Sequence, residues 1–154
     1  MANKKGTALL MVWANIPDDK EAEFNKWYNE EHLAELLSIP GVLNAARYEA
    51  VKSGPKHLAC YELESAAVVQ TPDFKDRPRT PWGEKVSPSI IGNPVISNVY
   101  EMIRPDALST GALNSGMAPA LQIGRMAVPA DQEEQWNHWY STVYTANYEK
   151  VPGC

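Results

Sequence analysis

The feature that most constrains the fold is an internal repeat, because residues 8–42 recur without gaps at residues 120–154. A rare Trp-Tyr pair and a Pro-Gly pair are among the residues that return at the offset of 112. A repeat of this length marks one supersecondary unit that is present twice. The second copy stops at the Pro-Gly pair that ends its predicted helix, so we expect one whole unit and only the start of another. The identical residues include Ala8, Leu9, Pro17, Asp19, Glu21, Asn25, Trp27, Tyr28, Pro40 and Gly41, matched by Ala120, Leu121, Pro129, Asp131, Glu133, Asn137, Trp139, Tyr140, Pro152 and Gly153.

The pattern of apolar residues predicts the elements of the first unit. Residues 7–16 form a short apolar run that is typical of a buried strand. Pro17 and two acidic residues after it indicate the start of a helix, which runs to about Leu37 and ends before Pro40-Gly41. The other predicted elements are strands over residues 43–51, 57–64 and 94–104, and weaker helical patterns broken by prolines over residues 65–90.

This order, β-α-β-β-α-β, predicts an α+β fold built on the ferredoxin-like unit, in which helices cover one face of an antiparallel sheet. The opposite face of such a sheet must also be covered, and a second unit can cover it. We therefore expect a ferredoxin-like α/β-barrel unit over residues 1–104 and a linker over residues 105–119. Residues 120–154 would form the β-α start of a second unit, a strand plus a helix.

Composition excludes several classes of function. The net charge is −5 and no long basic run occurs, which argues against nucleic-acid binding. No apolar run approaches the ~20 residues of a membrane span. The two cysteines and three histidines lack metal-ligand spacing, and no glycine-rich nucleotide motif occurs, so we expect no metal and no cofactor. Few cysteines and no signal peptide favour a cytoplasmic location.

An acidic residue interrupts the aromatic face of the first helix. On a wheel of 100° per residue, Glu31 falls in the stripe of Phe24 and Trp27. The second copy has Val143 at the position of Glu31, so the site is partly buried and the scaffold does not require an acid there. A buried carboxylate is costly unless it is paired or protonated. Either Glu31 has a functional role, or it pairs with Arg47 or a backbone amide.

A histidine follows this acid, and it differs between the two copies in the same way. The second copy has Tyr144 where the first has His32. Histidine titrates near neutrality and suits proton transfer, and the neighbouring Glu31 can hold its tautomer. Tyr28, one turn earlier, can donate a hydrogen bond to a carbonyl or enolate oxygen. We therefore predict His32, Glu31 and Tyr28 as catalytic residues.

Four further side chains are predicted to bind a substrate. Trp13, Trp27 and Tyr61 can line an aromatic pocket, and Arg47 can bind a carboxylate. Strand aromatics are more often core residues, and Arg47 can instead be a surface charge or pair with a neighbouring glutamate. Both interpretations remain open at this point.

The string W-Y-N-E-E-H-L at residues 27–33, followed by I-P-G-V at residues 39–42, resembles the dimeric α/β-barrel superfamily and, within it, the EthD-like branch. The resemblance covers the first three strands well and residues 120–154 in part. It implies a homodimer or higher homo-oligomer with a cleft between sheet and helices that holds a flat apolar molecule. Members include muconolactone-type isomerases, polyketide cyclases, cofactor-free monooxygenases and haem-handling enzymes. A histidine in or near the first helix often acts there as acid or base, and His32 matches it.

Three functions follow from these residues and from the resemblance. We favour a small cofactor-independent enzyme of isomerase, cyclase or lyase type, in which His32 acts on an aromatic, lactone or polyketide-like molecule. The first alternative is a haem-binding or oxidative enzyme with His32 as axial ligand. The second is a non-catalytic binding or assembly module in which the partial repeat clasps a partner chain.

Overall fold

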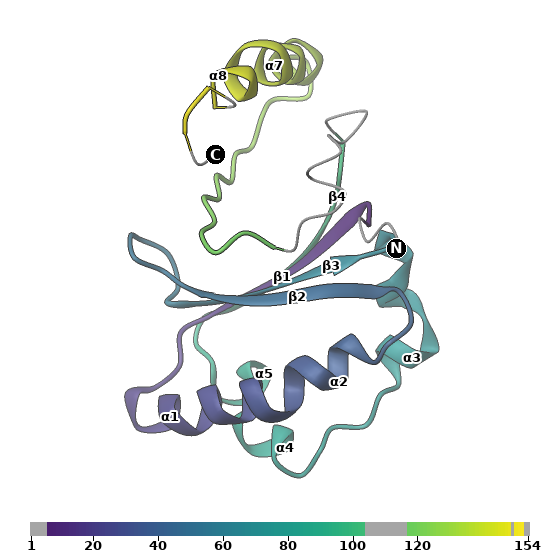
Figure 1. Cartoon of the computed structure of the whole chain (residues 1–154), viewed down its shortest axis with the longest axis vertical. Helices are drawn as coiled ribbons and strands as arrows, with labels where there is room; N and C mark the ends of the chain where they lie inside the picture. Colours follow the sequence, from purple (N-terminus) through teal and green to yellow (C-terminus); the bar gives the residue numbers. More distant parts are fainter. Residues whose placement is uncertain (1–5, 104–116, 149, 153–154) are drawn as a thin grey trace. The chain divides into compact units, whose positions relative to one another are not determined.

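The structure is a computed structural model of the chain, and it describes residues 6–103, 117–148 and 150–152. The chain divides into two compact units (Figure 1). The first holds the described residues up to 102 together with residues 117–120, and the second holds residue 103 and the described residues from 121 onward. Most of the expected linker over residues 105–119 lies outside the described residues, as does Cys154. The predicted domain boundaries therefore stay predictions.

The first unit is built on one four-stranded antiparallel sheet with the strand order β2-β3-β1-β4. The central strand β1 pairs with β3 and β4, so that Met11 lies opposite Cys60 on one side and Asn98 on the other. This topology confirms the predicted α+β ferredoxin-like unit. The strands are β1 (Ala8–Ala14), β2 (Val42–Glu49), β3 (His57–Leu63) and β4 (Val95–Glu101), each within three residues of the predicted bounds at either end.

One long helical segment covers one face of this sheet (Figure 1). It consists of α1 (Asp18–Trp27), η1 (Tyr28–His32) and α2 (Leu33–Leu37), which follow one another without a break. Phe24, Trp27 and Leu36 are almost fully buried against the sheet. After α2 the chain turns at Gly41, whose φ of +88° and close contact with Val68 exclude a larger side chain.

The middle part of this helix is a π-helical turn. The backbone N–H of Leu33 bonds to the carbonyl of Tyr28, five residues earlier, where an α-helix would use the residue four earlier. The wider turn accommodates one extra residue and shifts the later side chains by one position around the helix. As a result His32 and Leu36 follow Trp27 and Tyr28 on the sheet side. A regular wheel had placed Glu31 there.

Four short helical segments take the place of the second ferredoxin-like helix. Prolines divide this stretch, because a proline starts a helix well but cannot continue one. Two of the segments begin with a proline, Pro72 and Pro88. These pieces form the second wall on the helix-bearing face of the sheet. They are η2 (Ala66–Gln70), α3 (Pro72–Lys75), α4 (Gly83–Val86) and α5 (Pro88–Ile91).

The other face of the sheet carries a second apolar cluster. Met11 and Trp13 of β1 pack there with Leu58 and Cys60 of β3. Met117 contacts this cluster within the same unit, so part of the face is covered by the chain itself.

The second unit contains the helix of the repeat but not its strand. The helix comprises α7 (Glu133–Trp139), η3 (Tyr140–Tyr144) and α8 (Thr145–Tyr148). Residues 120–128, expected to form a strand, have irregular backbone. A strand needs a neighbour for its backbone hydrogen bonds, and the described residues of this unit provide none. No helix in the described part of the chain is long and apolar enough to cross a membrane.

The π turn recurs at the matching position of the second copy. There the N–H of Thr145 bonds to the carbonyl of Tyr140, the counterparts of Leu33 and Tyr28 at the offset of 112. The ring contact between positions 27 and 32 also recurs, as Trp139 against Tyr144. The two helices therefore share a backbone irregularity in addition to identical residues.

If the π turn holds one inserted residue, the fold should tolerate the deletion of one residue from this turn. Deleting the exposed Glu30 leaves Trp27, His32 and Leu36 on one face of a regular α-helix, so we expect a melting temperature within a few degrees of wild type. Deleting the exposed Lys26 instead rotates Phe24 off the core and should cost about 3 kcal/mol or more. Thermal and urea unfolding of both variants measure this, and equal destabilisation by the two deletions would contradict the interpretation.

Candidate functional site

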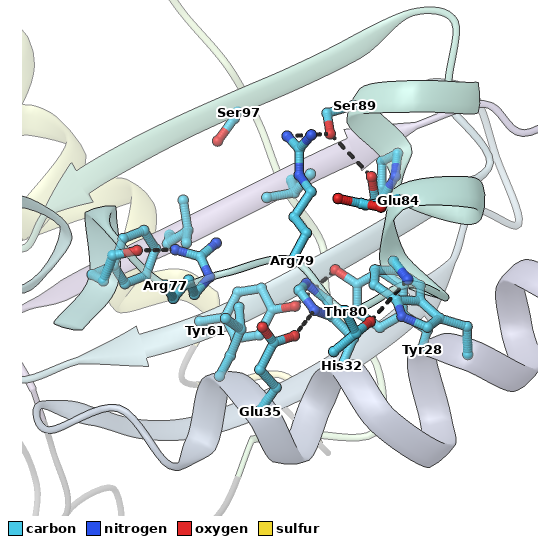
Figure 2. Close-up of a pocket in the computed structure, with 18 of the residues that line it drawn as sticks. Tyr28, His32, Glu35, Tyr61, Arg77, Arg79, Thr80, Glu84, Ser89 and Ser97 are labelled. Carbon is cyan, nitrogen blue, oxygen red and sulfur yellow. Dashed lines mark hydrogen bonds and ion pairs between the residues drawn. The ribbon is translucent and has the colours of Figure 1, made fainter.

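A cavity of about 610 Å³ lies between the helix-bearing face of the sheet, the first helix and residues 74–89 (Figure 2). Its base is formed by side chains of three strands, with Leu10 and Val12 from β1, Tyr61 from β3 and Ser97 from β4. The helix adds one wall and the short segments the other. The cavity belongs entirely to the first unit.

His32 lies in the wall that the first helix contributes. Its ring stacks on Trp27, with ring centres 4.3 Å apart and planes 19° apart, and meets Tyr28 edge-on. Its Nδ1 lies 2.8 Å from a carboxylate oxygen of Glu35 (Figure 2). A carboxylate can only accept here, so the neutral imidazole carries its proton on Nδ1 and presents an unprotonated Nε2.

The environment of His32 favours its neutral form. Burial lowers the pKa of His32, and the positive charge of Arg77 acts in the same direction. The hydrogen bond and negative charge of Glu35, with a smaller effect of Glu31, oppose this lowering. At neutral pH the ring is therefore available as a proton acceptor whose tautomer is set by Glu35.

Two tyrosine hydroxyls form a buried pair at the base of the cavity. The oxygens of Tyr28 and Tyr61 lie 2.7 Å apart, and both rings line the cavity. Burial raises the pKa of Tyr28 to about 12 and that of Tyr61 well above its usual value, so both stay protonated. One hydroxyl donates to the other, which leaves the second proton free for a ligand oxygen.

Glu31, predicted to orient His32, has other partners. It accepts hydrogen bonds from the indole Nε1 of Trp27, at 2.8 Å, and from the hydroxyl of Thr80. The same hydroxyl accepts from the backbone N–H of Gly83 at 2.9 Å. Glu31 therefore ties the first helix to the segment that forms the opposite wall, while Glu35 holds the histidine.

Two of the predicted substrate-binding residues are not among the described residues that line the cavity. Trp13 belongs to the apolar cluster on the other face of the sheet, because successive strand residues alternate between faces. Arg47 lies over the rings of Phe24 and Tyr28. It donates to the side-chain oxygens of two asparagines of the first helix, Asn25 and Asn29. The other two, Trp27 and Tyr61, do line the cavity.

Several lining residues were not predicted from the sequence. Glu35 lies three residues after His32, a spacing at which helical side chains meet, and this signal was available. Arg77, Arg79 and Thr80 lie in a proline-rich stretch without periodicity, so nothing local places them at a site. The aliphatic hydroxyls that line the cavity come from the same stretch and from β4. They are those of Thr80, Ser87, Ser89 and Ser97.

Within the described residues, no group of three histidine, cysteine, aspartate or glutamate side chains could hold a metal ion. The polar groups that do converge are an oriented imidazole, a pair of neutral phenols and two guanidinium groups. Such a set can take up a proton, stabilise a developing negative charge on oxygen, and attract an anion.

No protein-family model and no curated protein matches the sequence. Solved structures share the fold. A dimeric ferredoxin-like protein from an uncultured marine organism aligns with a TM-score of 0.52 and 14% identity, over 70% of this chain and 97% of that one. The chain therefore shares the ferredoxin-like fold of that protein.

Two further solved structures align with lower TM-scores. One is an EthD family protein from Bacillus halodurans, with 19% identity over 63% of this chain and 99% of that one and a TM-score of 0.45. Another is a haem degrader from Mycobacterium tuberculosis, with 14% identity, 65% and 99% coverage and the same TM-score. The likeness to the marine protein, at 14% identity, shows the fold alone and leaves the reaction to the residues of the cavity.

The pair of His32 and Glu35 makes a prediction about titration. Replacing Glu35 with Gln removes the negative charge that holds the proton on His32, so the pKa of His32 should fall below its wild-type value. An NMR titration of the histidine ring signals, assigned with His32→Gln, measures the shift. Glu30→Gln removes a nearby exposed carboxylate as the control, and a rise in the pKa of the Glu35→Gln variant would contradict the assignment.

Proposed function

We propose that this protein is a cofactor-independent acid-base enzyme acting on a small planar molecule with an acidic C–H group beside a carbonyl. The observation that carries the proposal is the joint presence in one cavity of His32, oriented by Glu35, and the protonated pair of Tyr28 and Tyr61. A base and an oxyanion donor on the same small cavity are the two groups that enolisation requires.

The reaction balances without any further reagent. Nε2 of His32 takes the proton from carbon, and the electron pair of that C–H bond moves onto the carbonyl oxygen. The enolate oxygen then accepts the free hydroxyl proton of the tyrosine pair as a hydrogen bond. The imidazolium formed, stabilised by Glu35, returns its proton to a different carbon in an isomerisation. In a cyclisation the enolate carbon bonds to a second carbonyl carbon of the same molecule, and the imidazolium protonates the alkoxide oxygen that results. In a lyase reaction the bond from carbon to a leaving oxygen breaks, and the imidazolium protonates that oxygen.

The shape and polarity of the cavity support a flat, partly apolar ligand. Its base has Leu10, Val12 and Tyr61, and the helical wall adds the rings of Trp27 and Tyr28. Aromatic and aliphatic walls with a few converging polar groups are typical of small-molecule sites of this size. Aromatic, lactone and polyketide-like molecules fit this description.

Haem binding through His32 is the second candidate, favoured by one observation. A metal-bound imidazole is usually supported by a carboxylate on its other ring nitrogen, and Glu35 occupies that position. The residues around His32 therefore suit an axial ligand as well as a base. Adding haem and recording the absorption spectrum separates the candidates, since axial ligation shifts and sharpens the intense absorption band of free haem, and His32→Gln would lose that change.

We also propose that the protein is a homodimer. The similar protein from a marine organism is described as dimeric, and the edge strand β4 exposes Val99 and Tyr100. The non-catalytic assembly module stays as an alternative to the enzyme, because dimerisation is compatible with both. Light scattering coupled to gel filtration measures the mass, and a monomer would count against the dimer.

The acid-base proposal predicts proton exchange that depends on His32. A panel of planar ketones and lactones in D₂O should include a compound whose acidic C–H exchanges faster with wild type, and His32→Gln should reduce that acceleration at least a hundredfold. NMR integration measures the rate. His138→Gln, which removes an exposed histidine of the second unit, is the matched control. Equal rates for wild type and His32→Gln would contradict the proposal.

A further inference from the structure

Two arginines line the cavity without an acidic partner. Arg77 and Arg79 are both among its lining residues and come from one short stretch around Pro78 (Figure 2). Within the described residues, no carboxylate lies within ion-pair distance of either guanidinium. Lys56 of the same unit, by contrast, forms an ion pair with Glu21 at 2.6 Å.

The contacts that these arginines do make hold them in place without neutralising them. Arg77 lies over the ring of Phe74, 4.4 Å from its centre, and donates to the backbone carbonyl of the same residue. Arg79 donates to the hydroxyl of Ser89 at 3.2 Å (Figure 2). A guanidinium has five N–H donors, so each keeps several free for a ligand.

The charge of Arg77 acts on the candidate catalytic groups. It lowers the pKa of Tyr28, Tyr61 and His32 alike, as a nearby positive charge does for each of these groups. Its positive charge is therefore felt where a ligand oxygen would accept from the tyrosine pair.

The lining charges leave a net positive cavity. The cations are Lys75, Arg77 and Arg79, and the carboxylates are Glu35 and Glu84. Glu35 is already engaged by His32. The chain as a whole carries a charge of −5, so a net positive cavity is a local feature and not a consequence of composition. Guanidinium groups match the planar geometry of a carboxylate.

We propose that the ligand of this cavity is a planar organic acid whose carboxylate is bound by Arg77 and Arg79. The inference rests on the proposed function, because it names the substrate class of the same site. Carboxylate binding at this wall leaves the flat part of the molecule against Trp27 and its carbonyl near the tyrosine pair. The hydroxyls of Ser87 and Ser89, themselves 3.1 Å apart, border the same wall and can complete the hydrogen bonds of the acid.

The test is calorimetric titration with 2-naphthoate and its neutral isostere 2-naphthamide, which differ in charge but hardly in shape. We expect wild type to bind the naphthoate about tenfold more tightly than the amide, with a preference that declines as salt is raised. Arg79→Gln and Arg77→Gln should each remove most of that preference while the amide binds as before. Lys52→Gln, which removes an exposed cation of the β2–β3 turn, is the matched control and should keep the preference.

Because Arg77 packs on Phe74, Arg77→Lys is a second variant that keeps the charge and should retain part of the preference. Equal affinity of wild type for both compounds would overturn the carboxylate site, as would an undiminished preference in both glutamine variants. These results would leave the acid-base proposal standing, since that depends on proton exchange by His32. Failure of both compounds to bind wild type would overturn the organic-acid site, and the exchange assay would then judge the acid-base proposal separately.

Discussion

The arrangement of the cavity depends on a backbone hydrogen bond of unusual span, from the N–H of Leu33 to the carbonyl of Tyr28. The π turn that it closes moves every later side chain of the helix by one position. Without the extra residue, Glu31 would follow Trp27 on the sheet side, and His32 would lie at the edge of that face beside Tyr28. With it, His32 lies on Trp27, and Leu36 enters the core one turn later. A π turn costs hydrogen-bond geometry and is found most often where function benefits from it.

The electrostatics of the site follow from burial. In water a phenol ionises near pH 10 and an imidazole is half protonated near pH 6.5. Removing water keeps the phenols of Tyr28 and Tyr61 protonated and keeps His32 neutral. The two arginines bring positive charge to the same space from the opposite wall. The base and the phenol donors are neutral, and the cations lie on the wall opposite the helix, so that none of these groups neutralises another and all can act on one ligand.

The sequence predicted most of the fold because the four strands and the first helix depend on local patterns. Patterns of apolar residues bounded by turn residues placed the strands, and the repeat identified the helix that would carry polar groups. The π turn could not be read from a wheel of fixed period, although Trp27 and His32, five residues apart, both carry rings, as do the matching Trp139 and Tyr144. That conserved ring spacing was the available signal.

The rest of the site depends on tertiary structure that no local pattern encodes. Arg77 and Arg79 reach the cavity because prolines divide the second helical stretch into pieces that fold back over the sheet. Arg47 was predicted at the site because it lies in a strand, yet two asparagines on the first helix bind its guanidinium instead. Predicting the two cavity arginines requires the path of a loop, and predicting the contacts of Arg47 requires the position of a neighbouring helix. Neither is a property of a short segment.

The recurrence of the π turn bears on the history of the molecule. An extra residue at the same place in two copies is most simply inherited from one ancestor that already had it, since otherwise the same insertion must have happened twice. The widened turn would then be older than the difference between His32 and Tyr144, or between Glu31 and Val143. On this view the geometry came first, and the histidine chemistry was gained or lost later, one side chain at a time, on a backbone already shaped to present it.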